Sequence, residues 1–236
     1  MEGEQGVNFK QNTIALAVGS VCLAGGAWAA EPNTMEIAPI TVSGEKINRS
    51  LEQTQSSVVV VTEQQLRDKA DHSLVDVFAR TPGVYSQAGN ENWGIRGVPV
   101  SGFDDQGPAT LNGAVSVYVD GAVQPNRTLT LSPTGLWDVE QVEVFLGPQS
   151  TTQGRNSLAG AVVIQTRNPT FQPTFSAQTN VGNYGEKGAA VAGGGSIVDD
   201  KIAGRIALDY QDGDGYIDNI ALGKDANPHR TSNARG

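Results

Sequence analysis

The chain has 236 residues, of which 29 are glycine and 17% are charged, and its formal net charge is −9 at pH 7. This composition favours a β-rich chain with many turns over a helical bundle. The acidic balance argues against a nucleic-acid-binding protein, because the scattered Lys and Arg residues cannot assemble a basic face. The single cysteine, Cys22, lies in the N-terminal leader, so we expect no disulfide, thiolate metal site or cysteine nucleophile in the mature chain.

Residues Met1–Ala29 have the pattern of a secretory signal peptide. Lys10 precedes an apolar run of small residues from Ile14 to Gly26, and Ala27-Trp28-Ala29 is an A-x-A cleavage site. The apolar run is too short and too rich in glycine for a good membrane span. An exported, cysteine-free and β-rich chain indicates the bacterial cell envelope.

Residues 30–49 form a polar tail with a short apolar run, and an ordinary linker is one interpretation of it. Because its flanks give it no core to join, we expect the tail to be mobile. Its β-branched part, Ile40–Ser43, could add a strand to the edge of a partner's sheet. Pro39 lacks a backbone donor. The run consists of Ile37, Ala38, Pro39, Ile40, Thr41, Val42 and Ser43.

A strand followed by two short helices is predicted next. Val58–Thr62 is a fully apolar run, and Thr62-Glu63-Gln64-Gln65 has the pattern of a capping box at the start of a helix. Ser73 caps a second helix that ends at Thr81-Pro82-Gly83. The buried side of the second helix is expected to consist of Leu74, Val75, Val77 and Phe78.

The next part of the chain alternates between loops and short strands. Val84–Asn92 is predicted to be a polar loop, and Gly94–Gly97 a short strand that contains Arg96. Val115–Asp120 alternates apolar and polar residues, as a strand does, and Asp120-Gly121 is a strong hairpin turn. An arginine in a mostly apolar strand is costly unless it is paired, so Arg96 should have a carboxylate partner.

Residues 139–169 read as strand, Gly-Pro turn, polar loop, glycine bend and strand. Glu140 and Glu143 precede the turn, and Arg155 follows it. We interpret these charges, together with Arg96, as a salt-bridged latch. The alternative is a hairpin with ordinary surface charges, whose ion pairs would contribute little to stability.

After Pro169 the pattern changes to dyad repeats of about ten residues, which are typical of transmembrane β-barrel strands. Phe175–Val181 and Ile202–Gln211 alternate apolar residues with small or polar ones, Glu186–Val198 is a weaker strand, and Tyr216-Ile217 could open a fourth. Apolar positions would face lipid and the others the lumen.

The stretch VEQVEVFLGPQSTTQGRNSLAGAVVIQTRNP, residues 139–169, resembles the closing segment of the plug domain in TonB-dependent outer-membrane receptors. The T-P-G-V, I-R-G and V-Y-V-D-G stretches resemble the same domain, and the resemblance runs from about Ile37 to the C-terminus. This chain departs from the family pattern where Gln153 replaces the usual Tyr. It departs again at Phe145-Leu146, which replaces the common Leu-Arg, so one expected arginine is missing.

The resemblance implies an α+β plug domain, a mixed β-sheet with short helices, followed by the first antiparallel strands of a transmembrane β-barrel. The implied domains are a signal peptide at 1–29, a periplasmic tail with the TonB box at 30–49, the plug at 50–168 and an incomplete start of the barrel at 169–236. Plugged transporters have about 22 strands, more than this last part can supply. We therefore expect a fragment, a truncated gene product or a piece that needs the missing strands.

The resemblance also implies energised uptake of a scarce ligand, by default an iron-siderophore complex, across the Gram-negative outer membrane. The TonB C-terminal domain, with its inner-membrane energising complex, would bind the TonB box, and outer-membrane lipid would surround the barrel. Carboxylates of the plug or of the barrel wall could pair with Arg96. Weak ligand contacts are expected at the plug apex, although loop aromatics more often pack than bind: Tyr85, Asn90, Trp93, Phe103 and Arg127.

Two other functional classes remain open from the sequence: a truncated, soluble periplasmic plug module that binds TonB or ligand without transport, and a degraded gene copy. Enzymatic chemistry is not expected. The glycines of 147–155 are spaced too widely for a phosphate-binding loop. Asp212, Asp214 and Asp218 resemble calcium ligands, but Tyr216 interrupts the pattern and a hairpin loop is the alternative. We predict no catalytic residue, no metal site, no cofactor and no nucleic-acid partner.

Overall fold

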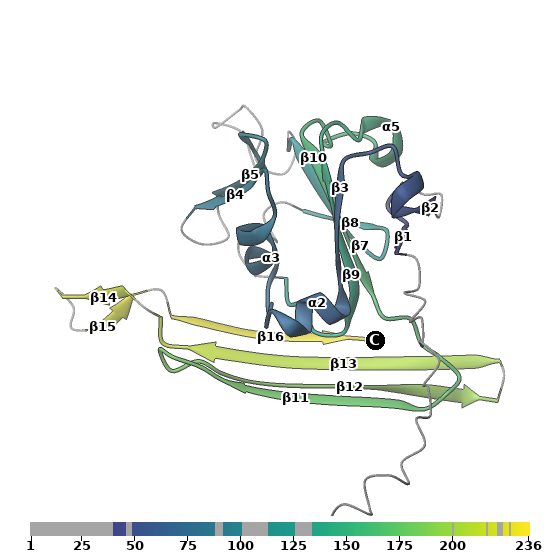
Figure 1. The fold of residues 1–236 in the computed structure, drawn as a ribbon. Coiled ribbons are helices and arrows are strands. Elements are labelled where there is room, and N and C mark those ends of the chain that lie inside the picture. The colour runs from purple at the N-terminus through teal and green to yellow at the C-terminus, as the bar shows by residue number, and fades with distance from the viewer. Residues whose placement is uncertain are drawn as a thin grey trace, which may run out of the picture. The chain divides into compact units, whose positions relative to one another are not determined.

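The computed structural model describes residues 40–45, 49–87, 92–100, 113–125, 134–199, 201–215, 217–220, 224–226 and 228–236. The expected signal peptide and Ile37–Pro39 lie outside these residues. All described residues belong to one unit, Pro39–Gly236, which contains a five-stranded and a four-stranded sheet (Figure 1). The described part of the chain contains no helix with the length and apolarity that a membrane crossing requires.

The five-stranded sheet is mixed, with the order β3-β9-β10-β7-β8. All neighbours are antiparallel except β10 and β7, which are parallel. Val162 at the middle of β10 lies opposite Val144 on one side and Val117 on the other. The strands are β3 (Val58–Thr62), β9 (Val139–Leu146), β10 (Gly160–Thr166), β7 (Val115–Val119) and β8 (Ala122–Gln124).

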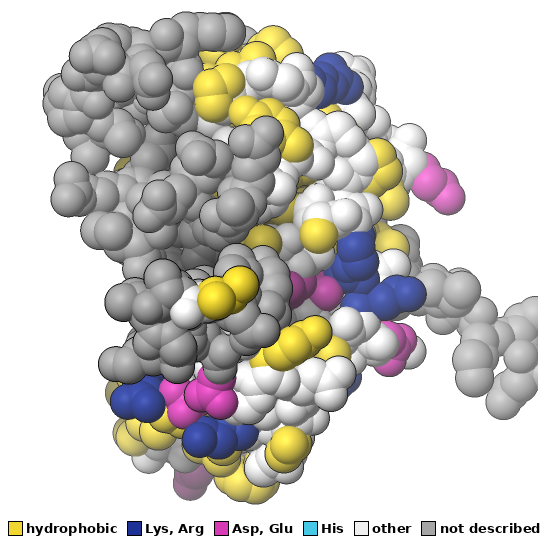
Figure 2. Space-filling model, turned by 90° about the vertical axis from the view of Figure 1, so that its left-hand side faces the viewer, with side chains coloured by type: hydrophobic (Ala, Val, Ile, Leu, Met, Phe, Trp, Pro, Cys, Tyr) yellow, Lys and Arg dark blue, Asp and Glu magenta, His cyan; other side chains and the backbone are white. Residues whose placement is uncertain are grey.

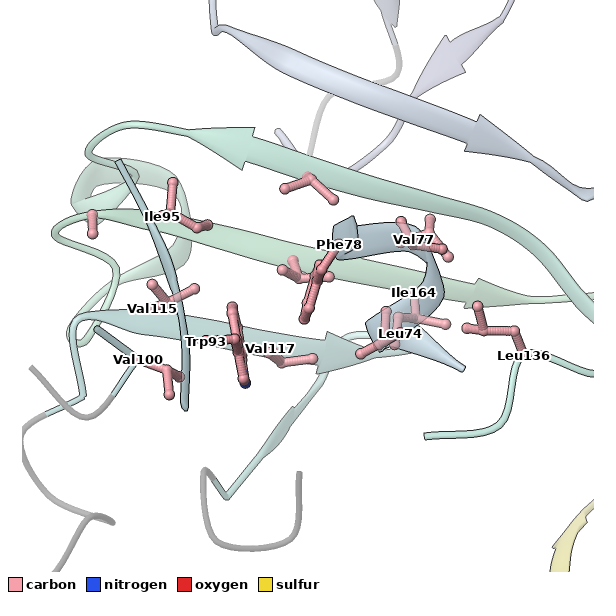
Figure 3. Close-up of a cluster of buried hydrophobic side chains, with 14 of the residues drawn as sticks. Leu74, Val77, Phe78, Trp93, Ile95, Val100, Val115, Val117, Leu136 and Ile164 are labelled. Carbon is pink, nitrogen blue, oxygen red and sulfur yellow. The ribbon is translucent and has the colours of Figure 1, made fainter. Parts of the chain in front are cut away.

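Two short helices pack on one face of this sheet and begin where the sequence predicts. Helix α2 (Glu63–Asp68) has a capping box between Thr62 and Gln65, and α3 (Leu74–Arg80) has one between Ser73 and Asp76. Figure 3 shows Leu74, Val77 and Phe78 of α3 turned toward the strands. The buried cluster there includes, besides these three, Leu66, Trp93, Ile95, Val115, Val117, Val142, Val144, Val162 and Ile164.

The region after α3 differs from the predicted polar loop, because it forms a small antiparallel sheet of β4 (Val84–Gln87), β5 (Asn92–Ile95) and β6 (Val98–Pro99). The predicted strand at 94–97 ends at Ile95. Arg96 and Gly97 have φ values of 52° and 82°, so they form the turn between β5 and β6. Two consecutive residues with positive φ are typical of the tight turns that match the twist of a hairpin. The same signature recurs at Asp120-Gly121, where the sequence predicts it.

The opposite face of the sheet is covered by the N-terminal segment, which contradicts the expectation that the tail has no core to join. Strand β1 (Thr41–Val42) pairs with β2 (Arg49–Ser50), which leads into the 3-10 helix η1 (Leu51–Gln53). The Val42 side chain is 0% exposed and packs in a second buried cluster with Phe145, Ala161 and Val163.

The connection between β9 and β10 also differs from the expected polar loop, because it contains the short helix α5 (Ser150–Gln153). Gly160 follows where the chain enters β10. A Cβ atom at this position would collide with the carbonyl oxygen of Phe145 and lie 2.7 Å from Ile95 Cδ1. This glycine therefore allows β9, β10 and β5 to approach one another closely.

The four-stranded sheet is antiparallel, and its dyad alternation is confirmed. Along β13, Ile206, Leu208 and Tyr210 are exposed while Arg205, Ala207 and Asp209 are buried. The fourth strand of the sheet begins at His229. Of the predicted opening at Tyr216-Ile217, Tyr216 lies outside the described residues and Ile217 begins a separate short hairpin. The strands are β11 (Thr174–Val181), β12 (Lys187–Val198), β13 (Ile202–Gly213) and β16 (His229–Arg235), and the hairpin is β14 (Ile217–Asn219) and β15 (Lys224–Ala226).

Charged side chains pair at one end of this sheet. Asp212 lies 3.2 Å from Lys187 Nζ and 2.9 Å from Arg230 Nε. Both cations are mostly exposed, so solvent screens each pair and it contributes little to stability. In the described part of the face that Figure 2 shows, Lys and Arg side chains lie next to Asp and Glu side chains.

A buried ion pair joins the loop before β9 to the four-stranded sheet. Asp138 has a φ of 60° and directs both carboxylate oxygens to Arg205, whose Nε donates to Oδ2 at 2.6 Å. Both side chains are less than 10% exposed. The same loop receives hydrogen bonds from Arg235, while Trp137 Nε1 donates to the Val191 carbonyl at 3.0 Å.

We predict that Asp138→Asn lowers the free energy of unfolding by about 2–3 kcal/mol, because it leaves a buried guanidinium without its counter-charge. Asparagine tolerates the positive φ, so backbone strain does not contribute. Urea denaturation followed by fluorescence of the neighbouring Trp137 measures the change. Asp212→Asn, which removes the solvent-screened pairs on the strand that carries Arg205, is the matched control and should change stability much less. Equal effects of the two variants would contradict the importance of the buried pair.

A second prediction concerns the start of α3. Asp76 Oδ2 accepts hydrogen bonds from the backbone of His72 and Ser73 at 3.0 and 2.8 Å, and from Ser73 Oγ at 3.0 Å. Asp76→Ala removes these acceptors and should destabilise the protein by about 1–2 kcal/mol. The same denaturation measurement applies, and Asp68→Ala on the exposed side of α2 should change stability by less than about 0.5 kcal/mol. A neutral Asp76→Ala would show that the cap is dispensable.

Candidate functional site

The candidate site is the docked segment, residues 40–45, together with the side chains of the five-stranded sheet that hold it. Figure 1 shows β1 and β2 beside the sheet, near α5. Val42 anchors the segment in the apolar cluster around Phe145. On either side of Val42, the polar groups of the segment are bound by side chains of β9, β10 and α5.

Glu143 of β9 lies at the centre of these contacts, and its side chain is among the fully buried ones at 0% exposure. Its Oε1 accepts hydrogen bonds from Ser43 N at 2.8 Å and Ser43 Oγ at 2.9 Å, and its Oε2 accepts one from Gly44 N at 2.8 Å. Gln141 Nε2 donates to Oε1 at 2.7 Å. Burying a carboxylate costs several kcal/mol unless strong hydrogen bonds offset it, and these four donors provide that compensation.

Three glutamines bind the same segment. Gln141 of β9 donates to the Thr41 carbonyl at 3.1 Å, Gln153 of α5 donates to the Gly44 carbonyl, and Gln165 of β10 donates to Ser43 Oγ. We call Glu143 and these three glutamines the segment clamp. An open cavity of about 580 Å³ lies beside it, lined in part by the segment and the clamp.

The backbone groups of the segment are occupied in this arrangement. The Ile40 carbonyl accepts from Leu51 N at 2.9 Å, and β1 pairs with β2. On the other side, Thr41 O, Ser43 N, Gly44 N and Gly44 O are bound by the clamp. These four groups are therefore not free to form a ladder with a further strand.

The structure does not bring the four predicted latch residues together. Arg96 is exposed at the β5–β6 turn, and its guanidinium approaches Gly147. Glu140 and Arg155 are exposed, and among the described ion pairs none joins either arginine to Glu140 or Glu143. The premise that Arg96 lies in an apolar strand is wrong, since a turn leaves its charge in solvent. Glu143 is held by backbone and amide donors rather than by an arginine.

The predicted ligand contacts fall into two groups. Asn90, Phe103 and Arg127 lie outside the described residues. Tyr85 is partly buried in β4, with its ring against Gly94. Trp93 is 3% exposed, and its ring stacks on Phe78 with a centroid distance of 4.5 Å. Figure 3 shows both side chains in the buried cluster. The prediction is therefore wrong for Trp93, which belongs to the core.

The glutamines and the Asp138–Arg205 pair are the functional features that sequence reasoning missed. Glutamine is a common surface residue, so Gln141 and Gln165 carry no distinctive signal. Gln153 did carry one, because it stands where the family pattern usually has tyrosine. The Asp138–Arg205 pair joins a loop residue to a strand residue 67 positions away, which periodicity cannot connect.

Comparison with known proteins identifies a known domain within this chain. A family model described as "TonB-dependent Receptor Plug Domain" matches residues 50–161. The ferrioxamine B receptor of Salmonella typhimurium (strain SL1344) is 28% identical over 176 residues, which cover 72% of this chain and 24% of the relative. The ferric-pyoverdine 358 receptor of Pseudomonas putida is 27% identical over 213 residues, 89% of this chain and 25% of the relative. The chain thus spans about a quarter of the length of these relatives.

Solved structures agree with this assignment. The ferric yersiniabactin uptake receptor FyuA from Yersinia pestis matches with a TM-score of 0.63 and 26% identity, over 78% of this chain and 28% of that chain. The ferripyoverdine receptor of the outer membrane of Pseudomonas aeruginosa matches in fold with a TM-score of 0.64 and 21% identity, over 76% of this chain and 23% of that chain. Residues 50–161 are therefore identified as a TonB-dependent receptor plug domain.

Proposed function

We propose that this chain is the plug-bearing part of an outer-membrane receptor that takes up an iron-siderophore complex with energy supplied through TonB. The observation that carries the proposal is the plug-domain match at residues 50–161, together with relatives named as receptors for ferrioxamine B and ferric pyoverdine. The chemistry is then transport of a bound ligand, with no covalent step.

Residues Ile37–Ser43 are the proposed TonB box, the segment that the TonB C-terminal domain binds by strand addition. Two features of its described part support this role. It precedes the plug and is extended, and it contributes Val42 to the small cluster around Phe145 rather than to the large cluster under the helices. The segment can therefore leave the sheet without opening the main core.

The four-stranded sheet supports a membrane location over the soluble periplasmic module. Its outer face exposes large apolar side chains, among them Phe175 at 78%, Val181 at 89% and Ile206 at 62%. A contiguous apolar face of this kind in water favours aggregation, whereas in lipid it is the expected outer surface of a barrel wall. We place the plug inside that barrel and the N-terminal tail in the periplasm.

Deleting Ile37–Ser43 should abolish energised uptake while ligand binding persists, because the coupling segment is lost and the ligand-facing end of the plug is retained. Uptake and binding of radioactive iron are measured in cells that express the complete reading frame, with the iron loaded on ferrioxamine B, a pyoverdine or a catecholate siderophore. An equally long deletion, residues 30–36, is the control and should leave uptake intact.

Two results would contradict the proposal. Uptake that survives deletion of Ile37–Ser43 would exclude this segment as the TonB box. Absence of uptake and binding for all three siderophore classes, with the unaltered protein present in the outer membrane, would exclude the proposed substrate class.

A further inference from the structure

We propose that Glu143 is a positioning residue that holds residues 40–44 in a closed state, in which the segment cannot be bound as a strand, and that breaking the Glu143 contacts is the step that frees it. The identity of the freed segment as a TonB box rests on the proposed function. The contacts between Glu143 and the segment do not depend on that assignment.

Glu143 depends on hydrogen bonds from the segment rather than on an ion pair. Among the ion pairs of the described residues, none includes this buried carboxylate. Three of its four hydrogen-bond donors, Ser43 N, Ser43 Oγ and Gly44 N, belong to the segment itself. The carboxylate and the segment therefore depend on each other: each satisfies buried polar groups of the other that would otherwise lack partners.

Hydrogen-bond donors approach both carboxyl oxygens of Glu143. Oε1 already receives Ser43 N, Ser43 Oγ and Gln141 Nε2, and Oε2 faces Gly44 N. A glutamine at position 143 would fill the three-donor position with its oxygen, and its amide NH₂ would then face the N–H of Gly44. The glutamate side chain can accept from all four donors, because it has acceptors at both oxygens.

Gly44 of the segment lies too close to β9 for any larger side chain. A Cβ atom on Gly44 would lie 2.5 Å from Phe145 Cε2 and 2.7 Å from Glu143 Oε2. Real Cβ atoms do not approach other heavy atoms so closely, and the Phe145 ring is fully buried and cannot move aside easily. Position 44 thus requires glycine for the segment to reach Glu143.

The closed state also hides the surface that a partner strand would use. Val42 is buried, β1 pairs with β2, and the clamp binds Thr41 O, Ser43 N, Gly44 N and Gly44 O. Strand addition needs free backbone donors and acceptors along one edge. A partner can therefore bind only the open state, so the strength of the Glu143 contacts sets the fraction of molecules that can be engaged.

The test measures how often the segment opens. Val42→Cys places a thiol on the buried side of the segment. The variant is made in a Cys22→Ser background, which removes the cysteine of this sequence. The protein is expressed from its complete reading frame, and maleimide labelling of Cys at position 42 is followed in time. Glu143→Gln and Gly44→Ala should each accelerate labelling by about tenfold or more. The first variant removes the acceptor for the Gly44 N–H, and the second pushes the segment away from the Phe145 ring. Glu140→Gln, an exposed glutamate on the same strand, is the matched control and should leave the rate unchanged.

A second reporter separates release of the segment from unfolding of the plug. Val117→Cys places a thiol in the main cluster on the opposite face of the sheet. Its labelling should stay slow in Glu143→Gln and Gly44→Ala. Unchanged labelling at position 42 in both variants would overturn the proposal. Equal acceleration at positions 42 and 117 would also overturn it, since Glu143 would then act on the whole plug.

Capture by the purified C-terminal domain of TonB distinguishes this proposal from the proposed function. If faster labelling at position 42 is accompanied by stronger capture without ligand, Glu143 controls access to the TonB box. If labelling accelerates and capture stays absent in every variant, the clamp is confirmed and the assignment of the segment as a TonB box fails.

Discussion

The packing of the plug depends on β9 being buried on both faces. Val142 and Val144 face the helices and complete the large apolar cluster, while Glu143 and Phe145 face the other way and need a cover of their own. Phe145 requires apolar neighbours and Glu143 requires hydrogen-bond donors within the same small area. Residues 40–45 meet both needs, because Val42 packs on the ring and the next two residues present their N–H groups to the carboxylate.

This double requirement explains why so short a segment is placed so specifically. An apolar contact alone is tolerant of register, since a valine can slide along an apolar surface. Hydrogen bonds to a buried carboxylate are directional and costly to leave unmade, so they fix which residue lies where. The glutamines of β9, β10 and α5 extend the same directionality to the carbonyls of the segment.

Sequence patterns predicted the elements whose residues interact locally. The strand Val58–Thr62, the capping boxes at Thr62 and Ser73 and the dyad strands of the second sheet follow from spacing within a few residues, and they are confirmed. The partners of Glu143 could not be predicted in this way, because three of its four donors lie about 100 residues away in a stretch that looks like a linker. Arg96 was misinterpreted for a different reason: the resemblance to the family's I-R-G stretch suggested a strand, whereas Arg96 and the following glycine form a tight turn.

The order of strands in the five-stranded sheet has a mechanical consequence. The first strands along the chain have the fewest neighbours. Strands β1 and β2 form a two-residue ladder of their own, and β3 is an edge strand of the five-stranded sheet with a single neighbour, β9. A tension applied to the chain ahead of residue 40 would reach these elements in that sequence, breaking short ladders a few hydrogen bonds at a time. Strands β9, β10 and β7 each have a neighbour on both sides and would bear load later. The plug is therefore weakest along the direction in which its own N-terminus leads, and the strands with two neighbours are the most resistant.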